Sequence, residues 1–189
     1  GWNKEKLLQK GNSIIEIIMK QKELSDYDKL ALEDIRWRMP LIESNSKKFE
    51  DFGLKNDHLT HGDYHSYNIF FDDKDHVSYV FDFEKTAHAP RSYEILRSLM
   101  FMFYDNVNDR SIDKAKLYLS SYSNIYPISK EELKSGFNLY YLRFLHSFWI
   151  PEEHYIKHNY RVDELLAERF KLFKFLSENL EDLEKKLFD

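Results

Sequence analysis

The sequence contains no cysteine. A chain without thiols can form neither a disulfide scaffold nor a thiolate metal site, and this suits the reducing cytoplasm. Long apolar runs are also missing, since stretches such as 99–104 are far shorter than the ~20 residues that cross a bilayer. Positive charge is not in excess, because the net charge is −5, which argues against nucleic-acid or anionic-membrane partners. We therefore expect a soluble, cytoplasmic protein.

Glycine and proline are scarce, with five and four residues among 189, so little interrupts regular structure. Apolar residues make up 42% of the chain, enough for the packed core of one domain over residues 1–189. Their spacing is helical in most of the chain. The expected helices cover 4–22, a segment from Ser25 that Pro40 bends or ends, 92–104, 111–123, 130–149 closed by Pro151, and 162–186.

The middle of the chain has a different pattern. Asn68–Phe71 and Val77–Phe83 are short, rich in β-branched and aromatic residues, and separated by a polar turn, which predicts a β-hairpin. Side chains alternate along a strand, so Asp82 and Glu84 should leave the second strand on one face. The expected fold is mainly helical with this small hairpin inserted.

Polar residues that suit phosphoryl transfer surround the predicted hairpin. The run His61-Gly62-Asp63-Tyr64-His65-Ser66-Tyr67-Asn68 precedes it, and Phe81-Asp82-Phe83-Glu84 ends it. Phosphoryl transfer needs an oriented acceptor hydroxyl, a group that takes its proton, and metal ions held against the phosphates. Asp63 can accept the proton, while Asn68 and Asp82 can supply the oxygen ligands that Mg²⁺ prefers.

The motif His-Gly-Asp-x-His-x-x-Asn followed by Asp-Phe-Glu resembles the aminoglycoside phosphotransferase and choline kinase family. Protein kinases instead carry Arg where Gly62 stands. The resemblance implies the helical C-terminal lobe of a protein-kinase-like phosphotransferase. It implies that Asp63 is the catalytic base and that ATP or GTP is the phosphoryl donor. It also implies that Asn68 and Asp82 bind the nucleotide through its Mg²⁺ ion, as ligands of that ion.

The resemblance extends beyond the motif but is incomplete. Within 91–95, Glu94 stands where Asp is usual, and the family residue there braces the catalytic loop by hydrogen bonds. Ser66-Tyr67 replace a frequent Pro-Gly, and Tyr64 replaces a frequent Leu.

Several histidines could be read as metal ligands. His61 and His65 lack a third matching ligand nearby, so we expect His61 to support the metal-binding turn and His65 to line the catalytic loop. His154 and His158 are four residues apart, but no Glu stands between them as in helical zinc sites, and an exposed helix face is the preferred interpretation.

A nucleotide-binding lobe is not recognisable in the sequence. No Gly-rich loop follows a predicted strand, and no Lys lies in a strand of the Val-Ala-Ile-Lys kind. We therefore expect the C-terminal lobe only, with the N-terminal lobe supplied in cis or in trans. Alone, this lobe should bind nucleotide poorly and turn over slowly or not at all.

The predicted activity is transfer of a nucleotide γ-phosphoryl group to a hydroxyl of a small molecule. Aminoglycosides, choline-like amines, sugars and homoserine-like alcohols all suit the family as acceptors. The C-terminal half contains aromatic and acidic residues that could form an acceptor pocket for a cation, while core packing would explain the aromatic ones equally well. They are Tyr140, Tyr141, Phe148, Trp149, Glu152, Glu153 and Tyr155. One alternative is a non-catalytic binding or regulatory module. The other is a metal-dependent hydrolase, which would need a second cluster of carboxylates or histidines.

Overall fold

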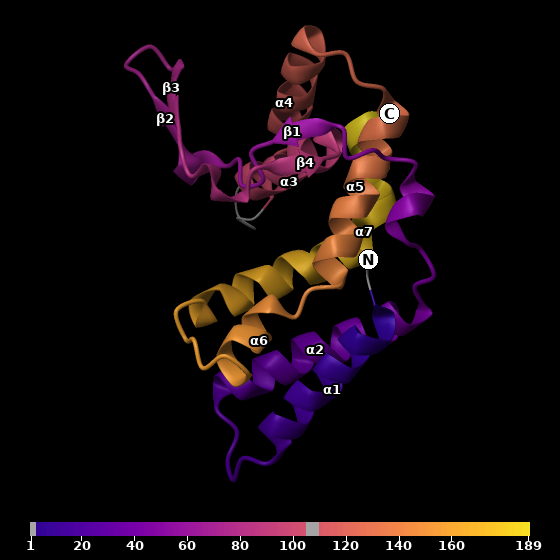
Figure 1. Ribbon diagram of the computed structural model, residues 1–189, viewed down its shortest axis with the longest axis vertical. Helices are drawn as coiled ribbons and strands as arrows, with labels where there is room; N and C mark the ends of the chain where they lie inside the picture. The colour runs from indigo at the N-terminus through magenta and orange to yellow at the C-terminus, as the bar shows by residue number, and fades with distance from the viewer. Residues whose placement is uncertain (1–2, 105–109) are drawn as a thin grey trace. The chain divides into compact units, whose positions relative to one another are not determined.

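The computed structural model describes residues 3–104 and 110–189, and most of them are helical (Figure 1). The helices are α1 (Lys4–Met19), α2 (Asp26–Ser44), α3 (Arg91–Phe103), α4 (Ile112–Ile125), α5 (Lys130–Leu145), α6 (Trp149–Tyr155) and α7 (Leu166–Phe188). The strands are β1 (His58–Thr60), β2 (Ile69–Phe71), β3 (Val77–Val80) and β4 (Ala87–Ala89). The prediction of a mainly helical chain with little β structure is confirmed. Within the described part of the chain, no helix combines the length and apolar character needed to cross a bilayer.

The chain groups into two compact units. The first consists of Gly1–Lys48 with Leu142–Glu178, and the second of Phe49–Tyr141 with Asn179–Asp189. The single kinase-like domain over residues 1–189, without a nucleotide-binding lobe, stays a prediction, and residues 1–2 and 105–109 of it lie outside the described residues.

In the first unit, α2 begins at a capping box. The Ser25 side chain accepts a hydrogen bond from the Asp28 amide at 3.1 Å, and the Asp28 carboxylate accepts one from the Ser25 amide at 2.8 Å. The expectation that Pro40 could end this helix is wrong, because α2 continues to Ser44. Ile42, beyond the proline, is fully buried, and this packing offsets the backbone hydrogen bond that a proline removes.

The helix predicted over 130–149 is also shorter than expected. α5 ends at Leu145, and α6 begins at Trp149. Pro151 therefore does not close a helix but lies in the first turn of α6, where the amide hydrogen that proline lacks has no helical partner. The expectation that Pro151 ends a helix is therefore wrong, because this proline lies near the beginning of one.

The second unit contains two short antiparallel ladders, one inside the other along the chain. The inner one is the predicted hairpin, in which β2 pairs with β3 and Ile69 lies opposite Val80. The outer one, β1 with β4, pairs Thr60 with Ala87 and was not predicted. The ladders leave two loops between them, 61–68 and 81–86, which are consequently held side by side.

The position of Asp82 differs from the expectation. β3 ends at Val80, and Asp82 adopts a left-handed backbone conformation (φ 65°) before the 3₁₀ turn Phe83–Lys85. Asp82 and Glu84 therefore do not leave one face of a strand, because the alternation of side chains stops before them. Asp82 belongs to the loop 81–86 and not to the hairpin.

Helices α3 and α5 approach closely at Gly136. A Cβ atom there would lie 2.6 Å from the Cβ of Ser92 and 2.7 Å from its carbonyl carbon. Such distances are far below van der Waals contact, so a side chain at this position would push the helices apart. α3 carries residues of the candidate site, and its placement therefore depends on this glycine.

We expect Gly136→Ala to lower the free energy of unfolding by about 2 kcal/mol, since the overpacking cost exceeds the helix propensity gained from alanine. The measurement is chemical denaturation followed by circular dichroism. Ser135→Ala, one position away and partly exposed, is the control and should change stability little. A Gly136→Ala variant as stable as the wild type would contradict the close helix contact.

Candidate active site

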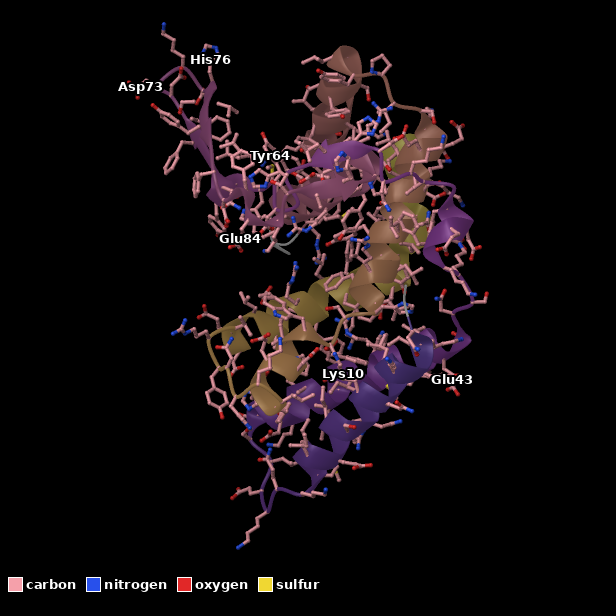
Figure 2. All side chains as sticks on the ribbon, viewed as in Figure 1. Lys10, Glu43, Tyr64, Asp73, His76 and Glu84 are labelled. Carbon is pink, nitrogen blue, oxygen red and sulfur yellow. The ribbon has the colours of Figure 1, made fainter. Side chains whose placement is uncertain are left out.

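The motif predicted to be catalytic lies in the two loops between the ladders. Figure 2 labels one residue of each loop, Tyr64 and Glu84, in the strand-containing part of the second unit, and Asp73 and His76 at the hairpin. The loops meet at Gly62, which has a positive φ of 80°. A Cβ atom there would lie 2.1 Å from the carbonyl oxygen of Lys85, so only glycine permits this approach.

His61 fastens the two loops together. Its Nδ1 accepts a hydrogen bond from the Asp63 amide at 3.2 Å, and its Nε2 lies 2.9 Å from the carbonyl oxygen of Phe81. A ring whose Nδ1 accepts and whose Nε2 donates is the neutral tautomer with its proton on Nε2. His61 thus ties the amide of the candidate base to the residue preceding Asp82.

Asp63 is buried, with 7% of its surface exposed, and cations surround its carboxylate. Lys85 Nζ lies 2.6 Å from Oδ2, and an Arg97 amino group donates to Oδ1. Burial by itself raises the pKa of Asp63, but the hydrogen bonds and charges of Lys85 and Arg97 outweigh it and lower the pKa from 3.8 to about 2. The carboxylate is therefore ionised throughout the physiological range.

His65 lies beside this ion-pair cluster. Its Nε2 is 3.5 Å from Asp63 Oδ1, its Nδ1 accepts from the Tyr67 amide at 3.3 Å, and its ring stacks on Phe101 with centroids 4.3 Å apart. Burial lowers the pKa of His65 although the Asp63 charge acts in the other direction. A neutral His65 packs the loop without adding a third positive charge.

Asn68 is buried and oriented by the catalytic loop itself. The side-chain Nδ2 of Asn68 donates a hydrogen bond to the backbone carbonyl oxygen of Asp63 at 2.9 Å. The backbone carbonyl oxygen of Asn68 accepts a hydrogen bond from the Phe81 amide at 3.2 Å. The first bond turns the amide so that Oδ1 has no hydrogen-bond partner among the described residues. The second joins Asn68 to the residue next to Asp82.

The ligand chemistry of Asn68 and Asp82 fits a magnesium ion. The Asp82 carboxylate is exposed and, within residues 3–104 and 110–189, has no ion pair or hydrogen bond. An amide oxygen and a carboxylate are hard ligands, and Mg²⁺ is commonly held by one or two such groups together with phosphates and water.

No group of three or more His, Cys, Asp or Glu in the described part of the chain could hold a metal by itself. The hydrolase alternative, which needs such a cluster, therefore has no support there.

Glu94 reaches the catalytic loop from α3. Its Oε1 accepts a hydrogen bond from the Gly62 amide at 2.7 Å, at the point where the loops meet. The longer glutamate side chain thus makes a bracing bond of the kind that the resemblance implies for this position. Glu84, by contrast, is exposed on the 3₁₀ turn and has no partner among the described residues.

The sequence analysis does not identify two side chains of the candidate site, Lys85 and Arg97, which bind the Asp63 carboxylate. A signal for Arg97 was present, because it follows Glu94 by three residues and so shares a face of α3 with it. Lys85 directly follows the Asp-Phe-Glu motif, but nothing in the pattern shows that its ammonium turns back to Asp63.

Most of the aromatic residues proposed for a cation pocket are core residues. Tyr140, Phe148 and Tyr155 are each less than 8% exposed, while Trp149 is 45% exposed. The nearby acids are paired, for example Glu152 with Lys10 at 2.6 Å. His154 bonds Asp163 at 2.9 Å, which fits the non-metal interpretation of this histidine.

A cavity of about 680 Å³ borders the catalytic loop within the second unit. His61 and Tyr64 of the loop, Glu94, and Tyr118 and Tyr122 of α4 contribute to its wall, whereas Asp63 does not. Its volume suits a small molecule, and an occupant would contact the loop without touching the candidate base.

Comparison with known protein families gives one match. The model of the phosphotransferase enzyme family APH matches residues 19–123, which is more than half of the chain and includes both loops of the site. The chain belongs to this family. The resemblance is thereby confirmed, and with it the phosphotransferase class and the helical lobe of a kinase-like fold. Neither the curated proteins nor the solved structures searched include a match.

The depressed pKa of Asp63 predicts an acid-dependent contribution to stability. A carboxylate with a lower pKa in the folded state stabilises the protein above its unfolded pKa, and the effect is lost as the pH falls through the folded value. We expect the Asp63 ion pairs to contribute on the order of 2 kcal/mol above pH 4 and to lose this contribution towards pH 2.

The measurement compares the unfolding free energies of wild type and Asp63→Asn between pH 2 and 7. Their difference should shrink as the pH falls from 4 to 2. Asp73→Asn, which removes an exposed carboxylate from the hairpin turn, is the control and should show no such trend. A difference that is constant through the acid range would contradict the ion-pair cluster.

Proposed function

We propose that the chain is the catalytic lobe of a small-molecule kinase that transfers the γ-phosphoryl group of ATP or GTP to a hydroxyl group. The observation that carries the proposal is the linkage of its three reactive residues. The Asn68 side chain donates a hydrogen bond to the backbone carbonyl of Asp63. Phe81, the residue next to Asp82, is bonded to the backbone carbonyl of Asn68 and to the His61 ring, which in turn accepts from the Asp63 amide. Family membership supports the phosphotransferase class.

In the proposed reaction, the acceptor hydroxyl hydrogen-bonds to Asp63. Its oxygen forms a bond to the γ-phosphorus while the bond from that phosphorus to the bridging oxygen breaks. The nucleoside diphosphate leaves with the electron pair, and the hydroxyl proton passes to the Asp63 carboxylate. A carboxylate with a pKa of about 2 is a weak base, so its larger contribution is to orient the hydroxyl.

The hydroxyl needs an oxygen of Asp63 that a cation now occupies. Lys85 is the partner that can leave, because its side chain is 54% exposed and the only ion pair of its ammonium within the described ranges is with Oδ2. An exposed ammonium is readily solvated by water when it moves away. The Lys85 contact therefore describes a resting arrangement of the base.

Asn68 and Asp82 would hold magnesium in this proposal. Kinases of the family generally use ATP and Mg²⁺. When bound, the ion would supply positive charge that offsets the negative charge of the transferred group. The role of Asn68 depends on the bond to the Asp63 carbonyl, which keeps its amide oxygen free.

We further propose that a nucleotide-binding lobe acts with this chain, either in the same polypeptide or as a separate one. We place this activity in the cytoplasm, without nucleic-acid or membrane partners. The acceptor is a small hydroxyl compound, with cationic amino alcohols and aminoglycosides among the candidates. A non-catalytic regulatory module is the second candidate. It is favoured by the cations on both oxygens of Asp63, since a permanently occupied carboxylate could not act on a substrate.

Asp63→Asn should lower kcat by ~10²–10⁴, the usual range for losing a side chain that orients the reacting hydroxyl and accepts its proton. The measurement is steady-state phosphoryl transfer to a panel of hydroxyl acceptors, with the chain joined to or mixed with a nucleotide-binding lobe. Asp73→Asn is the matched control and should leave kcat unchanged. Equal turnover by Asp63→Asn and wild type would contradict the assignment, and the absence of transfer to any acceptor would favour the regulatory module.

Asp82→Asn should remove the magnesium dependence of nucleotide binding, because the anionic ligand of the ion is lost. Calorimetric titration of the same preparation with ATP, with and without Mg²⁺, measures this dependence. Glu84→Gln, two residues along the same loop, serves as control for the loss of one negative charge. If magnesium strengthens nucleotide binding equally in Asp82→Asn and wild type, Asp82 does not hold the metal.

A further inference from the structure

Arg97 is a charged residue of the site that the family motif does not contain. It projects from α3 to Oδ1 of Asp63, and its side chain is 28% exposed. A guanidinium group has five N–H donors in a rigid plane. Among the described residues its only hydrogen-bond acceptor is the Asp63 carboxylate, so most of its donors are unused at the position where the transfer reaction would occur.

The charges around Asp63 do not balance. One carboxylate faces the ammonium of Lys85 and the guanidinium of Arg97. Among the described residues, the ion pair of Arg97 is with Asp63 and not with Asp82 or Glu84. In this arrangement Asp63 has one negative charge against two cationic partners, so Arg97 retains hydrogen-bond donors for an anion with several oxygen acceptors.

The two cations differ in what they can do. Lys85 reaches Asp63 through a long, exposed side chain, and it can move when the acceptor hydroxyl takes its place at Oδ2. Arg97 extends from a packed helix whose Glu94, one turn earlier, is fixed by the Gly62 amide. Guanidinium groups match the oxygens of phosphate with paired hydrogen bonds, which an ammonium group does not.

We propose that Arg97 is a phosphoryl-binding residue, which holds Asp63 Oδ1 with one amino group and binds the transferred phosphoryl group with its remaining donors. This inference rests on the proposed kinase function and adds a cation from α3 to it. Arg97 thus contacts both Asp63 and the γ-phosphoryl group. It stabilises the negative charge on the equatorial oxygens of that group during transfer.

The test measures the binding of inorganic tripolyphosphate with Mg²⁺ to the 189-residue chain, by nuclear magnetic resonance titration at millimolar concentrations. Arg97→Gln should raise the dissociation constant ~10-fold, which corresponds to about 1.4 kcal/mol. Arg97→Lys, which keeps the charge but loses the planar donors, should have an intermediate effect. Lys116→Gln removes the same charge from an exposed position on α4 and should bind as the wild type does.

A second pair of variants separates direct binding from an effect transmitted by Asp63. In the Asp63→Asn background, Arg97→Gln should again weaken tripolyphosphate binding ~10-fold, because the contact with the anion does not need the carboxylate. If the effect of Arg97→Gln disappears in that background, Arg97 only positions Asp63 and the proposal is overturned. Unchanged binding by Arg97→Gln, or no measurable binding by the wild type, also overturns it.

The outcome for Asp82→Asn distinguishes this inference from the proposed function. If Asp82→Asn binds like the wild type while Arg97→Gln is weakened, the magnesium assignment fails and the phosphoryl-binding role of Arg97 stands. The reverse result leaves the magnesium site and rejects the role of Arg97. Circular dichroism of each variant shows whether it is folded, and Arg97→Lys provides the test if Arg97→Gln does not fold.

Discussion

The candidate site depends on one close approach, between Gly62 and the backbone of Lys85. The carbonyl oxygen of Lys85 occupies the space that any other side chain at position 62 would need. The two loops are in contact because that space is free, and the cross-loop bonds of His61 to Phe81 and of Lys85 to Asp63 become possible. The flanking ladders fix the ends of the loops, and the glycine determines how closely their middles meet.

α3 is the scaffold on which this contact rests. Glu94 binds the Gly62 amide, and Arg97, one turn later, binds the Asp63 carboxylate. The two side chains have opposite charges and bind neighbouring residues of the loop. Glu94 accepts a hydrogen bond from the Gly62 amide, and Arg97 donates one to the Asp63 carboxylate. Fully buried apolar residues of the same helix, including Leu96 and Leu99, anchor its other face. A short loop is thus held by a helix that cannot shift without disturbing the core.

The sequence predicted the local features of this arrangement and missed those that depend on pairing over distance. The helices, the hairpin and the order of reactive residues could be read from spacing, because each lies within a short segment. The β1–β4 ladder joins three-residue strands whose midpoints, Leu59 and His88, are far apart in the chain, and three residues carry too little periodicity to be recognised. The contacts of Lys85 and Arg97 with Asp63 likewise join residues 22 and 34 positions apart, which spacing alone does not reveal.

A base held by two cations suits phosphoryl transfer better than it would suit most proton abstractions. The transition state of phosphoryl transfer is loose, so the acceptor oxygen needs little deprotonation before the bond to phosphorus forms. The cost of a low pKa at Asp63 is then small. Arg97, one of the two cations that lower it, would remain beside the group whose negative charge must be stabilised. Burial of Asp63 without Lys85 and Arg97 would raise its pKa and make it a stronger base, but it would leave no positive charge for the phosphoryl oxygens. The arrangement therefore favours charge stabilisation over basicity.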